Sequence, residues 1–220
     1  MIVVDGVTKV YPTRQGPRRV LDRVDLQVRK GEHLGIIGRN GSGKSTLIRL
    51  ISGAELPTAG RVTRGITVSW PLAFGGAFQA YLTGLDNLRF VCRIYGVNYK
   101  EAVSFVEEFS ELGSYLREPV RHYSSGMRAR LAFALSIAIE FECFLIDEVI
   151  AVGDSRFHER CRVELFEKRK DRALILVSHD AHTISAHCER AAVLVDGKLR
   201  SFDRVEEAQS FYLASTAPAA

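Results

Sequence analysis

Residues 33–51 read HLGIIGRNGSGKSTLIRLI, and they decide the fold class. They open with a short apolar run, His33–Gly38, cross a glycine-rich stretch, and end in an amphipathic segment, Lys44–Ile51. A short apolar run bounded by glycine is typical of a buried strand, and apolar positions three and four residues apart indicate a helix. Two more apolar runs, Phe141–Ile146 and Ala173–Ser178, alternate with helix-length segments. This alternation predicts an α/β fold with a mostly parallel core sheet covered by helices.

The segments around this core predict a smaller β part and a helical part. Four runs read as the strands of an antiparallel β subdomain: Ile2–Val10, Val20–Val28, Gly60–Arg64 and Ile66–Trp70. Residues 11–19, rich in Pro, Gly and Arg, read as a loop between the first two. Residues 84–139 carry helical patterns, so we expect a helical subdomain inserted there, with Asn87 and Arg93 on its exposed surface.

The C-terminal region predicts a hairpin, a helix and a tail. Asp196-Gly197 lies between two alternating apolar segments, which is a hairpin signal. A short helix is expected over Val205–Leu213, and residues 215–220 are expected to be a disordered tail. One domain spanning residues 1–214 is the resulting prediction.

Composition limits the classes of protein to consider. The 220 residues, 46% hydrophobic and 25% charged, suit one globular domain, and a net charge of +4 is too small to indicate a nucleic-acid partner. No apolar run approaches the roughly 20 residues of a membrane span, and the N-terminus lacks a secretory pattern, so we expect the chain in the cytoplasm. The four cysteines form no C-x-x-C pair, which favours packed, reduced thiols. The basic run Arg160–Arg172 contains acids and is expected to form a solvated helix face.

Residues 38–45 match the P-loop pattern G-x-x-x-x-G-K-[ST] in its required place between strand and helix. In this motif backbone N–H groups close around phosphate oxygens, while Lys44 offers a cation to the β- and γ-phosphates and Ser45 a hydroxyl to Mg²⁺. The expected ligands are therefore ATP and Mg²⁺. The predicted nucleotide-binding residues of this segment are Gly38, Asn40, Gly41, Ser42, Gly43, Lys44, Ser45 and Thr46.

Three polar residues follow the other two predicted core strands. Asp147 and Glu148 come after the second, and His179 comes after the third. Ligands of open α/β sheets bind at the carboxyl ends of strands, so these side chains should face the same phosphates as Lys44. Asp147 would hold Mg²⁺ through water, and Glu148 would act as general base toward the attacking water. His179 would contact the γ-phosphate, with a packed or capping histidine as the alternative.

The segment YSSGMR, residues 123–128, precedes the second core strand and resembles the signature of ABC ATPases, usually written L-S-G-G-Q. Ser125 and Gly126 stand at the serine and first-glycine positions, and they are expected to open a helix over Met127–Ile139 whose N-terminus can bind phosphate. The chain departs from the usual pattern at Ser124, Met127 and Arg128. The residues expected to reach a partner's ATP are Ser124, Ser125, Gly126 and Met127.

The resemblance to ABC ATPases extends over residues 2–212 and implies further roles. Gln79 matches the Q-loop glutamine, which implies contact with Mg²⁺ and the attacking water. Tyr11 matches the aromatic residue that stacks on adenine, so its ring rather than its hydroxyl is expected to matter. Asp154 occupies the D-loop position.

Within that family the chain is similar to the ATPase subunits of capsule polysaccharide exporters, through the strings SWP, LTGLDN, YSSGMRARLAF and IDEVIAVGDSRF. The resemblance implies a homodimer, docked on a separate polytopic membrane subunit at the cytoplasmic face of the bacterial inner membrane, that hydrolyses ATP to export a lipid-linked polysaccharide. O-antigen and teichoic-acid exporter ATPases share part of the pattern and stay open as alternatives. A soluble ABC protein or a P-loop kinase or GTPase is disfavoured, because the chain has no tandem ATPase pair and no N-K-x-D string.

Overall fold

The structure is a computed structural model that describes residues 1–72, 78–147 and 155–216. The chain divides into two compact units. The described residues of the first unit are 1–71, 142–147 and 170–216, and those of the second are 72, 78–141 and 155–169.

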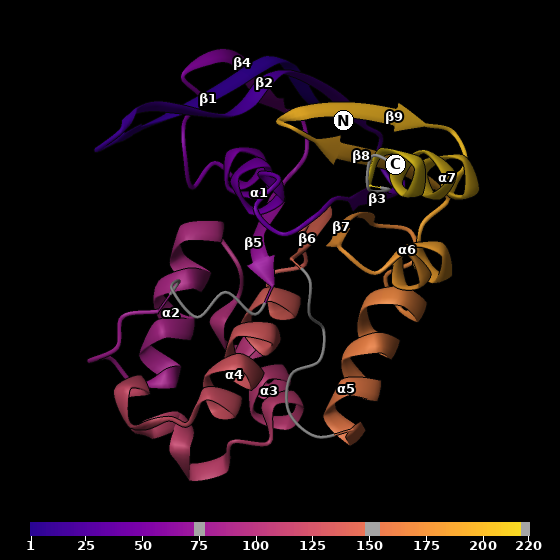
Figure 1. Cartoon of the computed structure of the whole chain (residues 1–220). Coiled ribbons are helices and arrows are strands. Elements are labelled where there is room, and N and C mark those ends of the chain that lie inside the picture. Colours follow the sequence, from indigo (N-terminus) through magenta and orange to yellow (C-terminus); the bar gives the residue numbers. More distant parts are fainter. Residues whose placement is uncertain (73–77, 148–154, 217–220) are drawn as a thin grey trace. The chain divides into compact units, whose positions relative to one another are not determined.

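The first unit contains the predicted parallel core as a six-stranded sheet in the order β5-β6-β7-β3-β8-β9 (Figure 1). The strands are β3 (His33–Ile37), β5 (Val68–Leu72), β6 (Cys143–Asp147), β7 (Ala173–Ser178), β8 (Arg190–Val195) and β9 (Lys198–Phe202). β7 pairs in parallel with β6 and β3, β3 pairs in parallel with β8, and β9 returns antiparallel to β8. Every residue of β7 is buried, as expected for a central strand covered on both faces.

A second, antiparallel sheet has the order β2-β1-β4, with β1 at Ile2–Thr13, β2 at Gly16–Val28 and β4 at Ala59–Arg64. The loop predicted at residues 11–19 is wrong, because both strands continue to a two-residue turn at residues 14 and 15. The Thr13 hydroxyl donates to the Gly16 carbonyl at 2.6 Å and closes that turn. The predicted strand Ile66–Trp70 is also corrected, since β5 joins the core sheet beside β6 instead of the antiparallel sheet.

Helix α1 (Lys44–Ser52) connects the two sheets through its apolar side chains. Leu47, Ile48, Leu50 and Ile51 are fully buried and belong to one apolar cluster with residues of β1, β2, β3, β6 and β7. The helix stops at Gly53, which has φ of 85° and donates its N–H to the Leu50 carbonyl. The packing of these apolar side chains holds α1 against both sheets.

Two further helices of the first unit follow β7 and β9. They are α6 (Ala181–His187) and α7 (Val205–Thr216). Helix α7 extends three residues beyond the predicted end at Leu213, so Ser215 is helical where a tail was expected. Residues 217–220 of that predicted tail lie outside the described part of the chain.

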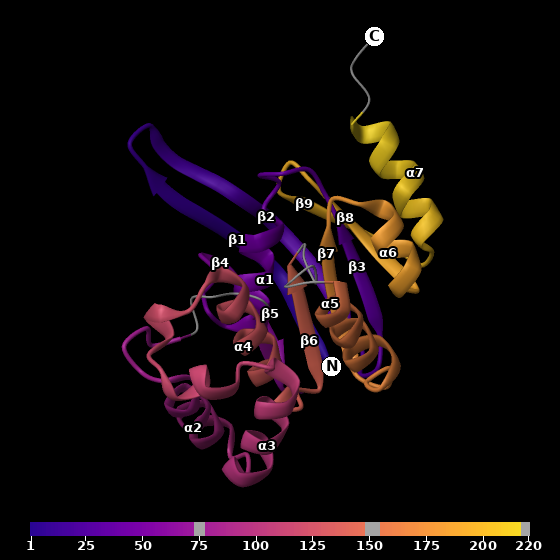
Figure 2. The ribbon, with the colours of Figure 1, turned by 90° about the horizontal axis from the view of Figure 1, so that it is seen from below.

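The second unit is helical, as predicted for residues 84–139 (Figure 2). Its elements are α2 (Gly84–Tyr95), α3 (Tyr99–Ser110), the 3₁₀ turns η2 (Gly113–Arg117) and η3 (Val120–His122), α4 (Ser125–Ala138), α5 (Ser155–Arg162) and the π-helical turn η4 (Val163–Glu167). Phe109, Phe133 and Phe157 join α3, α4 and α5, with ring centroids 5.4 to 6.3 Å apart. Aromatic pairs at this spacing add to the stabilisation from burial alone.

The basic run Arg160–Arg172, predicted as a solvated helix face, makes more side-chain contacts than expected. Arg160 forms an ion pair with Glu111, and its guanidinium lies 4.9 Å from the ring centroid of Phe109. The Glu164 side chain is 9% exposed and accepts from Lys168 and Arg169. Arg160 thus links α5 to the end of α3, and Lys168 and Arg169 supply the charged partners that the buried Glu164 carboxylate of η4 requires.

The cysteine prediction is confirmed: Cys92, Cys143, Cys161 and Cys188 are all buried and unbridged. Burial raises the pKa of Cys143, Cys161 and Cys188 to about 12, which keeps these thiols protonated and inert. Within residues 1–72, 78–147 and 155–216, no helix combines the length and the apolar character that crossing a bilayer requires.

Candidate nucleotide site

The P-loop joins β3 to α1 and takes its shape from its glycines. Gly41 and Gly43 have φ of 80° and 108°, a left-handed backbone that favours glycine. Gly38 has no room for a side chain, because an added Cβ would lie 2.7 Å from both the Leu194 carbonyl oxygen and the Ser42 Oγ. The glycines therefore allow the tight turn that leads from β3 into α1.

Helix α1 begins without a side-chain cap, because Gly43 occupies the N-cap position. Its first N–H groups and the positive end of its dipole are thus left for a ligand. Lys44 is 6% exposed, and its Nζ donates to the carbonyls of Gly38 at 2.8 Å and Arg39 at 3.1 Å. A cation beside an uncapped helix N-terminus is an arrangement suited to phosphate.

A cavity of about 410 Å³ lies at this helix start. It is lined by Arg18, Val20, Asn40, Gly41, Gly43, Lys44, Ser45 and Thr46. The buried Ser42 Oγ has no hydrogen-bond partner within the described residues, and a buried hydroxyl is normally bonded. The Thr46 hydroxyl accepts from Arg49 Nη2 at 3.3 Å and can still donate its own proton. The donors present fit a polyphosphate.

The strand register places Asp147 and His179 at the edge of the sheet where the P-loop begins. Asp147, the last residue of β6, pairs with Val177, and Ser178, the last residue of β7, pairs with Ile37 at the end of β3. Asp147 is half-buried, and His179 follows β7 directly with an exposed side chain. The carboxyl ends of three parallel strands therefore surround the loop, as predicted.

A magnesium ion fits the oxygen donors at this edge. Ser45 offers an exposed hydroxyl at the start of α1, and Asp147 offers a carboxylate at the end of β6. Mg²⁺ is usually held by one or two carboxylates, substrate phosphates and several waters rather than by an all-protein cage. No group of three or more His, Cys, Asp or Glu suited to a metal occurs in the parts of the chain that the structure describes.

Tyr11 lies on β1 of the same unit, half-buried, and its hydroxyl donates to Glu55 Oε2 at 2.8 Å. Directly across the hairpin it pairs with Arg18. Sequence reasoning missed Arg18 as a cavity residue because residues 11–19 read as a loop, and it missed Val20 although that residue was predicted to start a strand. A two-residue turn at residues 14 and 15 would have been the signal, since it fixes the register that sets Arg18 opposite Tyr11.

Gln79 lies in the second unit, with an exposed side chain and a fixed backbone. Its N–H donates to Asn87 Oδ1 at 2.9 Å, and its carbonyl accepts from Asn87 Nδ2 at 3.2 Å. Asn87 is 2% exposed, so its predicted exposure is wrong, whereas Arg93 is exposed as expected. The amide of Asn87 instead satisfies the backbone of the turn that presents Gln79.

The signature segment begins helix α4 two residues earlier than expected. Ser124 is the N-cap, and its hydroxyl accepts from the Met127 N–H at 3.2 Å. The helix starts at Ser125 rather than at Met127, with Ser125 exposed. Arg128, at the glutamine position of the usual signature, donates to the Tyr123 carbonyl at 2.7 Å. The capping role thus belongs to Ser124, which leaves Ser125 at the helix N-terminus with its hydroxyl turned to solvent.

Two predicted residues, Glu148 and Asp154, lie outside the described part of the chain. Tyr11, the P-loop, Asp147 and His179 therefore all belong to the first unit. Gln79 and the signature residues belong to the second unit.

Comparison with known proteins identifies the family. The family model described as ABC transporter matches residues 21–151. The chain is 60% identical over 212 residues to the capsule polysaccharide export ATP-binding protein CtrD of Neisseria meningitidis serogroup B, covering 96% of this chain and 98% of that protein. It is 57% identical, with the same coverage, to the ATP-binding protein BexA of Haemophilus influenzae.

A solved structure supports the fold. The dimeric ATP-binding cassette MJ0796, in a post-hydrolysis state bound to ADP and Pi, superposes with a TM-score of 0.77 at 23% identity, covering 92% of this chain and 98% of that one. The mostly parallel sheet, the antiparallel sheet and the helical unit are thus those of an ATP-binding cassette. The chain belongs to the ABC transporter family, as one of its ATP-binding subunits.

Proposed function

We propose that this chain hydrolyses ATP to drive the export of capsular polysaccharide. The observation that carries the proposal is the buried Lys44 at the uncapped start of α1, beside the carboxyl ends of β6 and β7. The 60% identity to a capsule polysaccharide export protein, over nearly the whole of both chains, supports the choice of cargo. The chemistry is phosphoryl transfer from ATP to water.

Each predicted site residue has a role that its chemistry suits. Lys44 and the loop N–H groups bind the β- and γ-phosphates, and the Tyr11 ring stacks on adenine. Glu148 takes the proton of the attacking water, and Gln79 orients that water. His179, exposed directly after β7, donates to the γ-phosphate. Mg²⁺, when bound between Ser45 and Asp147, would neutralise the charge that develops on the phosphate oxygens.

The assembled transporter contains two copies of this chain. Ser125, Gly126 and the start of α4 would bind the γ-phosphate of ATP held by the other copy, since both α1 and α4 offer a helix N-terminus to an anion. Asp154 of the D-loop would face the same interface. A separate polytopic membrane subunit would carry the lipid-linked polysaccharide, which holds this chain at the cytoplasmic face of the bacterial inner membrane. No nucleic acid takes part.

The test is the Mg²⁺-dependent ATPase rate of Glu148→Gln. The amide has the size of the carboxylate but cannot accept a proton, so we expect nucleotide binding to persist and turnover to fall about 10²- to 10⁴-fold. Lys44→Ala serves as the control that loses binding. Turnover of Glu148→Gln at the wild-type rate would show that Glu148 is not the base.

A further inference from the structure

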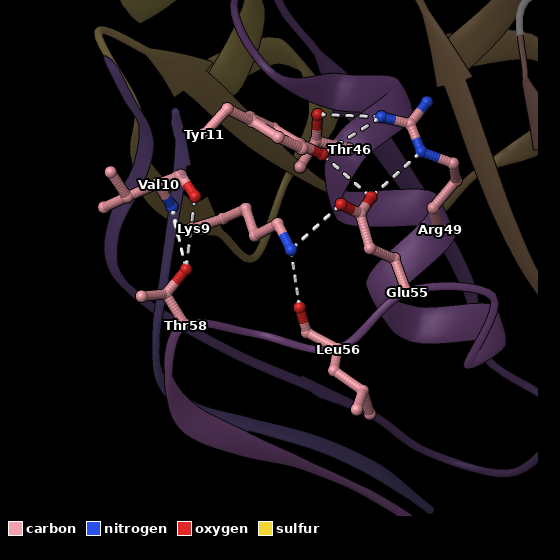
Figure 3. A network of polar contacts seen from close by, with 8 residues as sticks. All are labelled: Lys9, Val10, Tyr11, Thr46, Arg49, Glu55, Leu56 and Thr58. Atoms are coloured by element: carbon pink, nitrogen blue, oxygen red, sulfur yellow. Dashed lines mark hydrogen bonds and ion pairs between the residues drawn. The ribbon is translucent and has the colours of Figure 1, made fainter. Parts of the chain in front are cut away.

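The hydroxyl of Tyr11 lies in a network of charged groups that sequence reasoning did not anticipate (Figure 3). It donates to Glu55 Oε2 at 2.8 Å and accepts from Arg49 Nη2 at 3.3 Å. Arg49 Nε in turn donates to the same Glu55 oxygen at 3.1 Å. The three side chains form a closed triangle, so the hydroxyl has one defined position rather than a choice of water partners.

Lys9 completes the network from the other side of the carboxylate. Its Nζ lies 2.9 Å from Glu55 Oε1 and donates to the Leu56 carbonyl at 2.7 Å. The same ammonium lies 5.0 Å from the ring centroid of Tyr11, over one face of the ring. A cation over one face leaves the opposite face of an aromatic ring as the one on which a base can stack.

Glu55 is the centre of this arrangement. Its side chain is 22% exposed and receives hydrogen bonds or ion pairs from Lys9, Tyr11 and Arg49. Burial acts to raise the pKa of Glu55, but these donors outweigh it, so that the pKa lies below its usual value and the carboxylate stays ionised at neutral pH. Charge-assisted hydrogen bonds of this kind are stronger and more directional than neutral ones.

The network also joins two segments of the proposed nucleotide site, strand β1 and helix α1. Tyr11 is on β1, whereas Arg49 is on α1, the helix that begins at the P-loop, and Arg49 also donates to the Thr46 hydroxyl at 3.3 Å. A Tyr11 ring without this anchor could turn to other side-chain rotamers. Fixing it beforehand removes an ordering cost from nucleotide binding.

We propose that Glu55, with Arg49, is a positioning residue for nucleotide binding: it holds the Tyr11 ring at the base site by anchoring the tyrosine hydroxyl to the P-loop helix. The inference rests on the proposed stacking of Tyr11 on adenine. It predicts that Glu55 matters for the adenosine part of a nucleotide and not for the phosphates. It differs from the expectation that only the ring of Tyr11 matters, and Tyr11→Phe distinguishes the two.

Calorimetric titration with Mg²⁺-ADP and with Mg²⁺-pyrophosphate separates the two parts of the ligand. We expect Glu55→Gln to weaken ADP binding about 3- to 10-fold, while pyrophosphate binding changes less than about twofold. Tyr11→Phe, which removes the same hydrogen bond from the other side, should lose a similar factor for ADP. If Glu55→Gln is too unstable to purify, Tyr11→Phe alone decides, and an unchanged ADP affinity in it overturns the proposal.

A double-mutant cycle tests whether Glu55 acts through Tyr11. In a Tyr11→Ala background there is no ring to position, so adding Glu55→Gln should cost no further ADP affinity. The matched control is Glu142→Gln. It removes a carboxylate of the same unit that is bonded to Lys30 and Thr67 and does not belong to the Tyr11 network. This control should leave the ratio of ADP to pyrophosphate affinity unchanged.

Three further results would contradict one or the other of the two proposals, and the measurements distinguish them. Equal losses for ADP and pyrophosphate in Glu55→Gln would indicate a general effect on the P-loop and overturn the positioning role. A full additional loss from Glu55→Gln in the Tyr11→Ala background would also overturn it. An unchanged ADP affinity in Tyr11→Ala would instead refute the stacking role of Tyr11, whatever Glu55→Gln does.

Discussion

Arg18 is a cation of the nucleotide cavity that belongs to none of the ATPase motifs. It pairs with Tyr11 across the β1–β2 hairpin and lines the same cavity as Lys44 and Ser45. Its neighbour Arg19 forms an ion pair with Asp22 at 3.2 Å. Directly opposite residues of an antiparallel pair project to the same side, so the guanidinium of Arg18 lies on the side of the Tyr11 ring.

We predict that Arg18→Gln weakens ADP binding about fivefold to tenfold, because it removes a charge-assisted contact to phosphate. The loss should shrink as ionic strength rises, since an exposed charge is screened by salt. Titration of Mg²⁺-ADP at low and high salt measures both effects. Arg14→Gln, in the turn of the same hairpin, is the control and should bind as wild type. A salt-independent loss in Arg18→Gln would argue against a charge contact.

At the scale of elements, the start of α2 is packed against the residue that precedes the signature. Tyr123 is 3% exposed, and its hydroxyl donates to the Tyr115 carbonyl. Burial raises the pKa of Tyr123 to about 12, so the hydroxyl remains a donor at neutral pH. A Cβ added at Gly84 would lie 2.7 Å from this hydroxyl oxygen. The start of α2 and the residue before the signature helix are therefore joined through one tight contact.

Gly84→Ala should destabilise the chain by about 1 to 3 kcal/mol, because the methyl group overpacks the contact. Adding Tyr123→Phe removes the nearest atom, so the double variant should be less destabilised than the sum of the two single changes. Urea denaturation of the purified chain measures these values. Gly126→Ala is the control, since an added Cβ there meets only Ser124 Oγ at 3.9 Å. Strict additivity would show that Gly84 and Tyr123 do not constrain each other.

For the whole molecule, the two helix starts that are proposed to bind phosphate have a simple joint explanation. Lys44 opens α1 without a side-chain cap, and Ser125 opens α4 with its hydroxyl exposed. In the proposed homodimer each ATP is bound by α1 of one copy and α4 of the other, so a two-fold axis generates two equivalent sites. A variant in either segment then damages both sites of its own homodimer.

A mixture of Lys44→Ala and Gly126→Asp tests this sharing. In the mixed dimer one site carries both defects, while the other combines the intact P-loop of one variant with the intact signature of its partner. We expect ATP to stabilise a dimer only after mixing, as measured by light scattering. Gly126→Asp should fold, because the space around Gly126 is open. The shared-site model is wrong if variants that demonstrably exchange subunits form no ATP-stabilised dimer.

The sequence by itself determined the parts of this protein that depend on local pattern. The P-loop, the buried strands and helix α1 were predicted within a few residues, because strand and helix periodicities are properties of neighbouring residues. The carboxyl ends of parallel strands share one edge, so Asp147 and His179 could be placed beside the P-loop before any coordinates. The segment at residues 84–139 was predicted helical for the same reason.

Only the tertiary structure decided which distant residues meet. Tyr11 and Glu55 are 44 positions apart, and no periodicity relates them. Asn87 looked like an exposed helix residue, but the turn of Gln79 buries it. The strand Val68–Leu72 joined the core sheet, where the Leu145 N–H donates to the Ser69 Oγ across 76 positions. Such partners depend on loop geometry and on the packing of whole elements, which a local pattern does not encode.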